Sequence, residues 1–110
     1  MTDLAGKRCI PCSGSTPPLT RPQIKALLDQ VPEWEAILDH HLRRVFRFPD
    51  FQSALQFVNR IGAVAEAEAH HPSISFTWGR VEVEIWTHKI DGLSEADFVL
   101  AAKIDALPRG

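Results

Sequence analysis

The sequence predicts a small α+β domain in which a four-stranded antiparallel sheet carries three helices on one face, in the order α-β-β-α-β-β-α. Two pairs of stretches alternate apolar and polar residues around short turns, which is typical of hairpins. Three other stretches repeat apolar residues at helical spacing behind a residue that can cap a helix. The 110 residues are too few for two ordinary domains, so these elements share one core.

The N-terminal segment precedes the first periodic element. It contains Cys9-Ile10-Pro11-Cys12 and ends in Ser13-Gly14-Ser15-Thr16-Pro17-Pro18, which is typical of a surface segment. We expect a flexible tail at residues 1–19 and a single domain at residues 20–110. Cys9 and Cys12 are most simply two reduced thiols, because a zinc site needs about four ligands and only half of one is visible. A metal or redox role shared with another chain or segment is the alternative.

The first helix and first hairpin follow directly. Thr20 and Gln23 have the spacing of a capping box, and Pro32 ends the helix about three turns later. The strands of the hairpin are expected at residues 34–38 and 42–48, around a turn at Asp39-His40-His41. We expect ordinary solvated histidines in that turn.

The second helix is expected to begin behind Asp50 and to end near residue 69 or 70. Pro72 sets that end, because a residue before proline is pushed out of helical geometry. One apolar stripe should face the core. Its members are Phe51, Ala54, Leu55, Val58, Ile61 and Ala65.

The second hairpin has the clearest alternation, with Gly79-Arg80 as its expected turn. That turn would place Trp78 opposite Val81 and, further along, His71 opposite His88. In this register Trp78 lies on the core face and Trp86 on the other face.

The last helix is expected behind Ser94, and it is apolar around most of its circumference. Leu93, Ala96, Leu100, Ile104 and Leu107 form one stripe, but Phe98, Val99, Ala101 and Ala102 extend beyond it. A terminal helix of this kind buries a second face, so we expect a homo-oligomer contact there.

The overall charge and hydropathy exclude several classes. A net charge of -2 and a pI near 6.2 remove the electrostatic footprint of a general nucleic-acid binder. No stretch approaches the roughly 18 apolar residues of a membrane span, and the polar N-terminus does not resemble a secretory signal. We therefore expect a cytoplasmic protein with no nucleic-acid or membrane partner.

The histidines form the candidate site. The register places His71 beside His88, and Glu66 lies one helical turn before His70, where it could orient that ring. Imidazoles of this kind suit proton transfer, because one can accept a proton while another donates. A zinc site made of the three histidines and Glu66, or a cluster of solvated histidines without a function, are the alternatives that the residues leave open.

Several of these residues together are similar to a known family. The runs Glu66-Ala67-Glu68-Ala69-His70-His71-Pro72, Trp86-Thr87-His88 and Gly92-Leu93-Ser94-Glu95-Ala96-Asp97, with Trp78 between them, resemble the pterin-4a-carbinolamine dehydratases. Phe48-Pro49-Asp50-Phe51 also resembles the start of that family's second helix. The resemblance covers about residues 20–107, and its fold agrees with the element order derived above.

The resemblance implies a hydro-lyase that converts 4a-hydroxytetrahydrobiopterin, or a related 4a-hydroxytetrahydropterin, to the quinonoid dihydropterin and water. It implies His70, His71, His88 and Glu66 as the acid–base set, with no metal and no organic cofactor. We expect His70 and His88 to transfer protons and His71 to position the pterin. Trp86, Asp97 and Pro72 are the expected substrate-binding residues, although Asp97 can equally close the cap of the last helix.

The resemblance also implies partners. Members form homodimers or homotetramers, and they serve an aromatic amino acid hydroxylase that produces their substrate. Some animal members act instead as dimerisation cofactors of a transcription factor, and a non-catalytic interaction module that binds through the last helix is therefore the alternative function.

Overall fold

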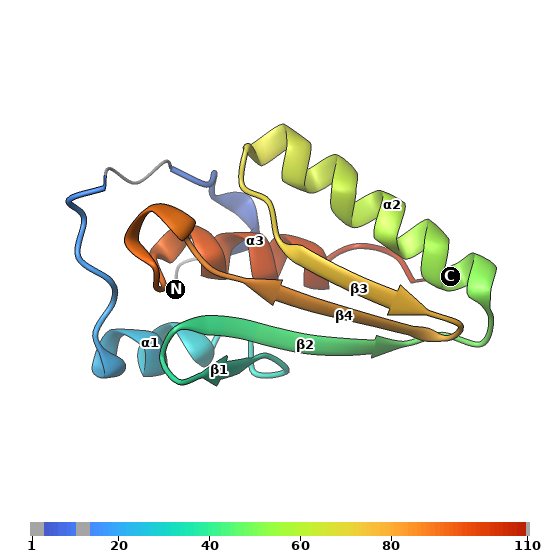
Figure 1. Cartoon of the computed structure of the whole chain (residues 1–110), viewed down its shortest axis with the longest axis horizontal. Helices are drawn as coiled ribbons and strands as arrows, with labels where there is room; N and C mark the ends of the chain where they lie inside the picture. The colour runs from blue at the N-terminus through green and yellow to red at the C-terminus, as the bar shows by residue number, and fades with distance from the viewer. Residues whose placement is uncertain (1–3, 11–13, 110) are drawn as a thin grey trace.

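The computed structural model describes residues 4–10 and 14–109 and has the predicted order of elements (Figure 1). In these residues, four antiparallel strands form one sheet in the order β1-β2-β4-β3. Short 3-10 turns, η1 at Leu4–Gly6 and η2 at His88–Ile90, flank the larger elements. The bounds are α1 Arg21–Leu28, β1 Glu35–Ile37, β2 His41–Arg47, α2 Phe51–Glu68, β3 Ser73–Thr77, β4 Arg80–Ile85 and α3 Glu95–Asp105.

The helix starts confirm the predicted caps. The Thr20 backbone N–H donates to Gln23 Oε1 over 2.8 Å, and the Ser53 backbone N–H donates to Asp50 Oδ1 over 2.7 Å. Ser94 and Asp97 form a second capping box at the start of α3. Each cap satisfies a backbone donor that the first helical turn leaves without a partner, so each helix begins where its sequence predicts.

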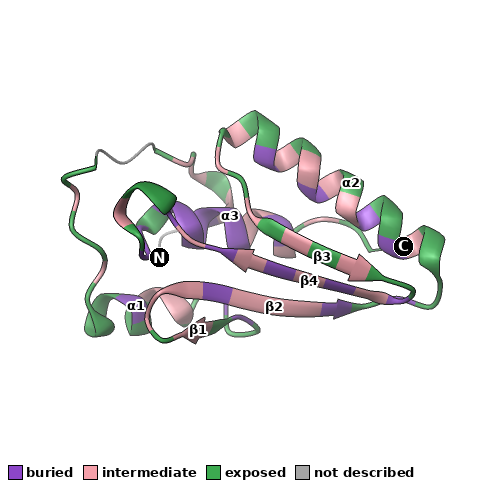
Figure 2. Cartoon of the chain, viewed as in Figure 1, coloured by how far each residue is buried: buried purple, intermediate pink, exposed green. Residues whose placement is uncertain are grey.

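The core lies between the sheet and the helices, as the purple segments in Figure 2 show. The predicted stripe of α2 is partly wrong, because Phe51 is 48% exposed and Leu55 is 38% exposed, while Phe57 is fully buried. Phe57 packs against Phe46 of β2 and against Phe48, which directly follows that strand, with ring centroids 4.7 and 5.1 Å away. These aromatic contacts turn the helix so that Ala54, Phe57, Ile61 and Ala65 face inward.

The turn of the second hairpin differs from the prediction. Thr77 pairs with Arg80, so Trp78 and Gly79 form the turn and the register is shifted by two residues. Gly79 has a φ of 73° in the second central position, which a type II turn requires. Trp78 is therefore a turn residue, 66% exposed, and its predicted place in the core is wrong.

A shift of two residues leaves the faces of the strands unchanged, because side chains alternate with a period of two. Val81, Val83 and Ile85 are buried as predicted. The predicted cross-strand pairing of His71 with His88 is not formed, because β4 ends at Ile85 and His88 begins η2.

The first hairpin has the predicted strands, but its turn is Leu38-Asp39-His40, and His41 opens β2. Leu38 and Asp39 both have positive φ, near 54° and 55°. Arg44 shares the face of β2 that carries the buried Leu42 and Phe46. Its charge is balanced there by Asp105 at the end of α3, with 2.6 Å between Nη1 and Oδ1.

The described part of the N-terminal segment, expected to be a flexible tail, packs on the domain. Leu4 is 2% exposed within the core cluster, and Lys103 Nζ donates to the Ala5 carbonyl over 2.8 Å. This segment lies along α3 (Figure 1). The chain therefore covers the second apolar face of α3 itself, and that face is not by itself evidence for a subunit contact. No helix in residues 4–10 or 14–109 is both long and apolar enough to cross a membrane.

Candidate active site

The centre of the candidate site is a contact between His70 and Asp97. His70 follows the end of α2, where Ala69 adopts a left-handed conformation with a φ of 53°. This sharp turn carries the chain away from the helix axis and brings His70 Nε2 to 2.6 Å from Asp97 Oδ1, on the first turn of α3. Two elements far apart in the sequence therefore meet at one imidazole.

Asp97 is completely buried, and both of its carboxylate oxygens accept hydrogen bonds. Besides His70, Oδ2 accepts hydrogen bonds from Thr87 Oγ1 over 2.9 Å and from the Ser94 backbone N–H over 2.8 Å. An ionised carboxylate only accepts, so His70 donates from Nε2 and keeps the lone pair of Nδ1 available for a proton. Asp97 thus sets both the orientation and the tautomer of His70, in addition to its predicted role in the cap of α3.

The expected contact between Glu66 and His70 is not formed. Its Oε1 lies 3.5 Å from His71 Nε2, and both side chains are largely exposed, 82% and 59%. His70 has turned toward Asp97 because the helix ends before it, so the one-turn spacing from Glu66 no longer applies.

An open pocket of about 220 Å³ lies beside these residues. It is lined by Ala69, His70, His71, Trp86, Thr87, His88 and Lys89. Trp86 and His88 pack together, with ring centroids 4.6 Å apart and planes inclined by 36°. The pocket therefore offers three imidazoles and one indole ring to a planar ligand.

The structure brings His70, His71, His88 and Trp86 together as the sequence predicts. Asp97 stands behind His70, whereas Glu66 and Pro72 are outside the residues that line the pocket. Sequence reasoning missed Thr87 and Ser94, whose hydroxyls lie 2.7 Å apart beside Asp97. The alternation of β4 could have indicated Thr87, because Thr87 continues the buried face on which Ile85 lies.

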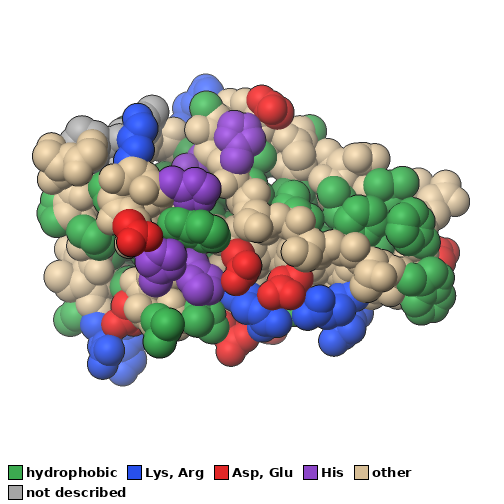
Figure 3. Space-filling model, viewed as in Figure 1, with side chains coloured by type: hydrophobic (Ala, Val, Ile, Leu, Met, Phe, Trp, Pro, Cys, Tyr) green, Lys and Arg blue, Asp and Glu red, His purple; other side chains and the backbone are tan. Residues whose placement is uncertain are grey.

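Sequence reasoning also missed the contribution of the first hairpin. His40 and His41, expected to be solvated, pack against Trp86 with ring centroids 5.6 and 5.9 Å away. Figure 3 shows histidine side chains gathered over the left half of this face of the molecule. Trp86 therefore lies between the histidines of the pocket and those of the hairpin.

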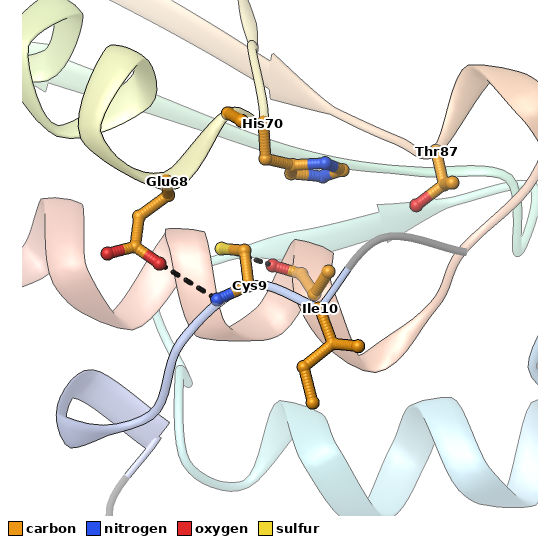
Figure 4. A pocket seen from close by; sticks show the side chains of 7 residues that line it. Cys9, Ile10, Glu68, His70 and Thr87 are labelled. Atoms are coloured by element: carbon orange, nitrogen blue, oxygen red, sulfur yellow. Dashed lines mark hydrogen bonds between the residues drawn. The ribbon is translucent and has the colours of Figure 1, made fainter.

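A small cavity lies on the other side of His70 (Figure 4). Cys9 and Ile10 of the N-terminal segment form part of its wall, with Glu68, His70 and Thr87 opposite. The Cys9 backbone N–H donates to Glu68 Oε1 over 2.8 Å, and this bond lowers the pKa of the Glu68 carboxyl. The N-terminal segment thus covers the rear of the His70 imidazole.

Cys9 itself is a poor nucleophile in this position. Burial, and then the negative charge of Glu68, raise the pKa of its thiol to about 11. A thiol that stays protonated at neutral pH is unreactive. Cys12 lies outside the described residues, so the predicted Cys9-x-x-Cys12 pair is seen only through Cys9.

The metal alternative has no geometric support in residues 4–10 and 14–109. Within them, no three His, Cys, Asp or Glu side chains are placed so that they could hold one metal ion. The fold and the site define a small α+β domain with a histidine-lined pocket.

Comparison with known proteins defines the group more closely. Residues 17–107 match the family model described as pterin 4 alpha carbinolamine dehydratase. A protein of Rubrobacter xylanophilus named "Putative pterin-4-alpha-carbinolamine dehydratase" is 55% identical over 107 residues, covering 97% of this chain and all of that protein. A protein of Alkaliphilus metalliredigens with the same name is 54% identical over 96% of each chain.

The fold has a solved counterpart as well. The crystal structure of a transcriptional coactivator/pterin dehydratase from Brucella melitensis matches with a TM-score of 0.77 and 30% identity, over 81% of this chain and 96% of that one. The chain belongs to the pterin-4a-carbinolamine dehydratase family.

Proposed function

We propose that the chain is a hydro-lyase that removes water from a 4a-hydroxytetrahydropterin, with 4a-hydroxytetrahydrobiopterin as the expected substrate, and releases the quinonoid dihydropterin. The observation that carries this proposal is the buried Asp97 carboxylate that fixes His70 at the edge of a pocket with two further histidines. Membership of the dehydratase family supports the same reaction.

The reaction needs one base and one acid. N5 of the pterin loses its proton, the C4a–N5 double bond forms, and the C4a–O bond breaks as the hydroxyl takes up a proton and leaves as water. One proton is removed and one is delivered, so two imidazoles complete the cycle without a net change. No metal ion or organic cofactor takes part in this scheme.

The proposed roles follow from the surroundings of each ring. His70 holds Nδ1 free because Nε2 is bonded to Asp97, so it suits the role of a base. His88, exposed at the mouth of the pocket, would exchange the second proton, and Trp86 beside it would form a wall against the pterin ring. His71 would position the pterin, with Glu66 holding its ring. Pro72 restricts the backbone next to His71. A contact between Pro72 and the substrate stays a prediction.

Stopped-flow absorbance of 4a-hydroxytetrahydrobiopterin decay tests the proposal. Wild-type protein should accelerate the decay with and without a chelator, and His88→Ala should lose most of that acceleration while keeping the circular dichroism of the fold. Decay at the spontaneous rate with wild-type protein would overturn the proposal, and loss of rate on chelation would overturn the metal-free scheme.

We also propose that the chain forms a homodimer or homotetramer and receives its substrate from an aromatic amino acid hydroxylase. A binding role through the last helix is the second candidate, because the similar Brucella melitensis protein is described as a transcriptional coactivator as well as a pterin dehydratase. Seven residues of α3 are buried within the chain, which leaves that helix little surface for a partner. Light scattering measures whether the chain is a monomer, dimer or tetramer. An aromatic amino acid hydroxylase assay with and without the protein measures whether the chain recycles the pterin that the hydroxylase releases.

A further inference from the structure

His40 and His41 form a chain of four polar groups together with two carboxylates. The two Nδ1 atoms lie 3.0 Å apart, His40 Nε2 lies 2.7 Å from Asp91 Oδ1, and His41 Nε2 lies 3.2 Å from Glu84 Oε2. Asp91 follows η2 and Glu84 belongs to β4, so three segments meet at the two rings.

The contacts of the two rings fix the number of protons that the pair needs. His40 Nε2 donates to Asp91, and one proton lies between the two Nδ1 atoms, on either ring. The Nε2 atom of His41 faces the Glu84 carboxylate, where an N–H completes the chain and a lone pair would face a negative oxygen. The arrangement is satisfied when the two rings together hold three protons, which gives the pair one shared positive charge.

The other charges near the pair are already matched. Asp39, in the same turn, accepts from Arg21 Nε over 2.9 Å. Arg43, the next charged residue of β2, contacts Glu82 and Glu35. The carboxylates that face the two histidines are thus Asp91 and Glu84, and one positive charge shared by the two rings offsets part of their charge.

The same pair packs against Trp86, which walls the proposed pterin pocket. The His41 and Trp86 ring centroids are 5.9 Å apart, within the range in which a cation attracts an aromatic ring. The His40 ring lies 5.6 Å from the same indole. The opposite neighbour of Trp86 is His88, at 4.6 Å.

We propose that the hydrogen-bonded pair of His40 and His41 fixes the orientation of Trp86 and hence the wall of the pterin pocket. Both histidines are positioning residues, since they act through Trp86. The effect on the pterin rests on the proposed function, whereas the contact of the pair with Trp86 stands on the hairpin geometry alone. Loss of either ring breaks the chain between Asp91 and Glu84 and removes a neighbour against which Trp86 packs.

The contact with Trp86 is tested without any substrate. In a Trp78→Phe background, which leaves Trp86 and the buried Trp34, the near-ultraviolet circular dichroism should weaken in His41→Gln, because Trp86 loses a ring that holds it in place. An unchanged near-ultraviolet spectrum in a folded His41→Gln variant would overturn the proposal.

The positioning role is tested by binding of 7,8-dihydrobiopterin, a pterin that lacks the 4a-hydroxyl. His41→Gln should raise its Kd about three- to tenfold, as expected for loss of one cation–aromatic contact. Asp39→Asn is the matched control, because it removes a carboxylate from the same turn that faces Arg21 instead. An unchanged Kd in His41→Gln would overturn the positioning role. Absence of binding to the wild-type protein would overturn the proposed function, and the near-ultraviolet spectra would still decide whether the histidine pair holds Trp86 in place.

Discussion

Replacement of Asp97 by asparagine separates the two roles of this residue, which caps α3 and orients His70. The wild-type carboxylate accepts from His70, Thr87 and the Ser94 backbone. An asparagine has nearly the same shape, but one of its two terminal atoms donates. If its oxygen keeps the bonds to Thr87 and Ser94, its NH2 group faces His70 Nε2, which must then accept. The proton of His70 moves to Nδ1, the atom that the proposed mechanism needs as a base.

The structure sets the size of both effects. One charge-assisted hydrogen bond of a fully buried group becomes a neutral one, which lowers the unfolding free energy by about 1 kcal/mol. The wrong tautomer in a catalytic histidine is far more costly to activity than to stability. In serine proteases the analogous change lowers kcat about 10⁴-fold, and we expect a fall of at least about 100-fold here, the lower range for one acid–base group.

The assay combines denaturant unfolding with stopped-flow decay of 4a-hydroxytetrahydrobiopterin. Ser94→Ala is the control, because it removes a hydroxyl beside Asp97 and weakens the cap of α3 by about 1 kcal/mol while leaving the His70 contact in place. We expect Ser94→Ala to keep kcat within about threefold of the wild type, an effect below 1 kcal/mol. Equal loss of kcat in the two variants would refute an orienting role for Asp97 and reduce it to a helix cap.

Three further predictions concern the frame around the site. Gly79→Ala should lower the unfolding free energy by about 1–3 kcal/mol, because φ is 73° and the added Cβ would lie 2.9 Å from a backbone carbonyl oxygen; an unchanged denaturation midpoint would contradict the turn. Arg44→Met should cost about 1–3 kcal/mol in the same assay, since it leaves the carboxylate of Asp105 without its cation, and stability equal to wild type would show that the pair contributes nothing. In a Cys12→Ser background, Cys9 should react slowly with a disulfide reagent at pH 8 and faster as the pH approaches 11, because the pKa of its thiol is raised to about 11. The protonated thiol contributes its full stability to the fold below its usual pKa of 9.0, and this contribution is lost as the pH rises through about 11. Rapid reaction at pH 8 would contradict the burial of Cys9.

Local chemistry predicted most of the fold. Thr20, Asp50 and Ser94 cap their helices as expected, because a cap depends on residues within one turn. The faces of the second hairpin were also predictable, since alternation survives a register shift of two. The turn itself was not, because Gly79 fits two positions of a turn and only the neighbouring strand decides between them.

The site was predictable in composition but not in pairing. The motifs place three histidines and Trp86 at one pocket. The partner of His70 depends on how α3 packs against the end of α2, which no local pattern encodes, so the one-turn spacing pointed to Glu66 instead of Asp97. The positions of His40 and His41 likewise depend on the pairing of β2 with β4.

The proposed proton-transfer role of His70 is tested by the rate of 4a-hydroxytetrahydrobiopterin decay with His70→Ala. The rate is compared with the wild type at equal protein concentration, after circular dichroism has shown that the variant is folded. Wild-type protein should accelerate the decay, and His70→Ala should return it to within about tenfold of the spontaneous rate, because the remaining imidazoles lack the Asp97 contact. A folded His70→Ala variant with the wild-type rate would contradict the role of His70 as the base.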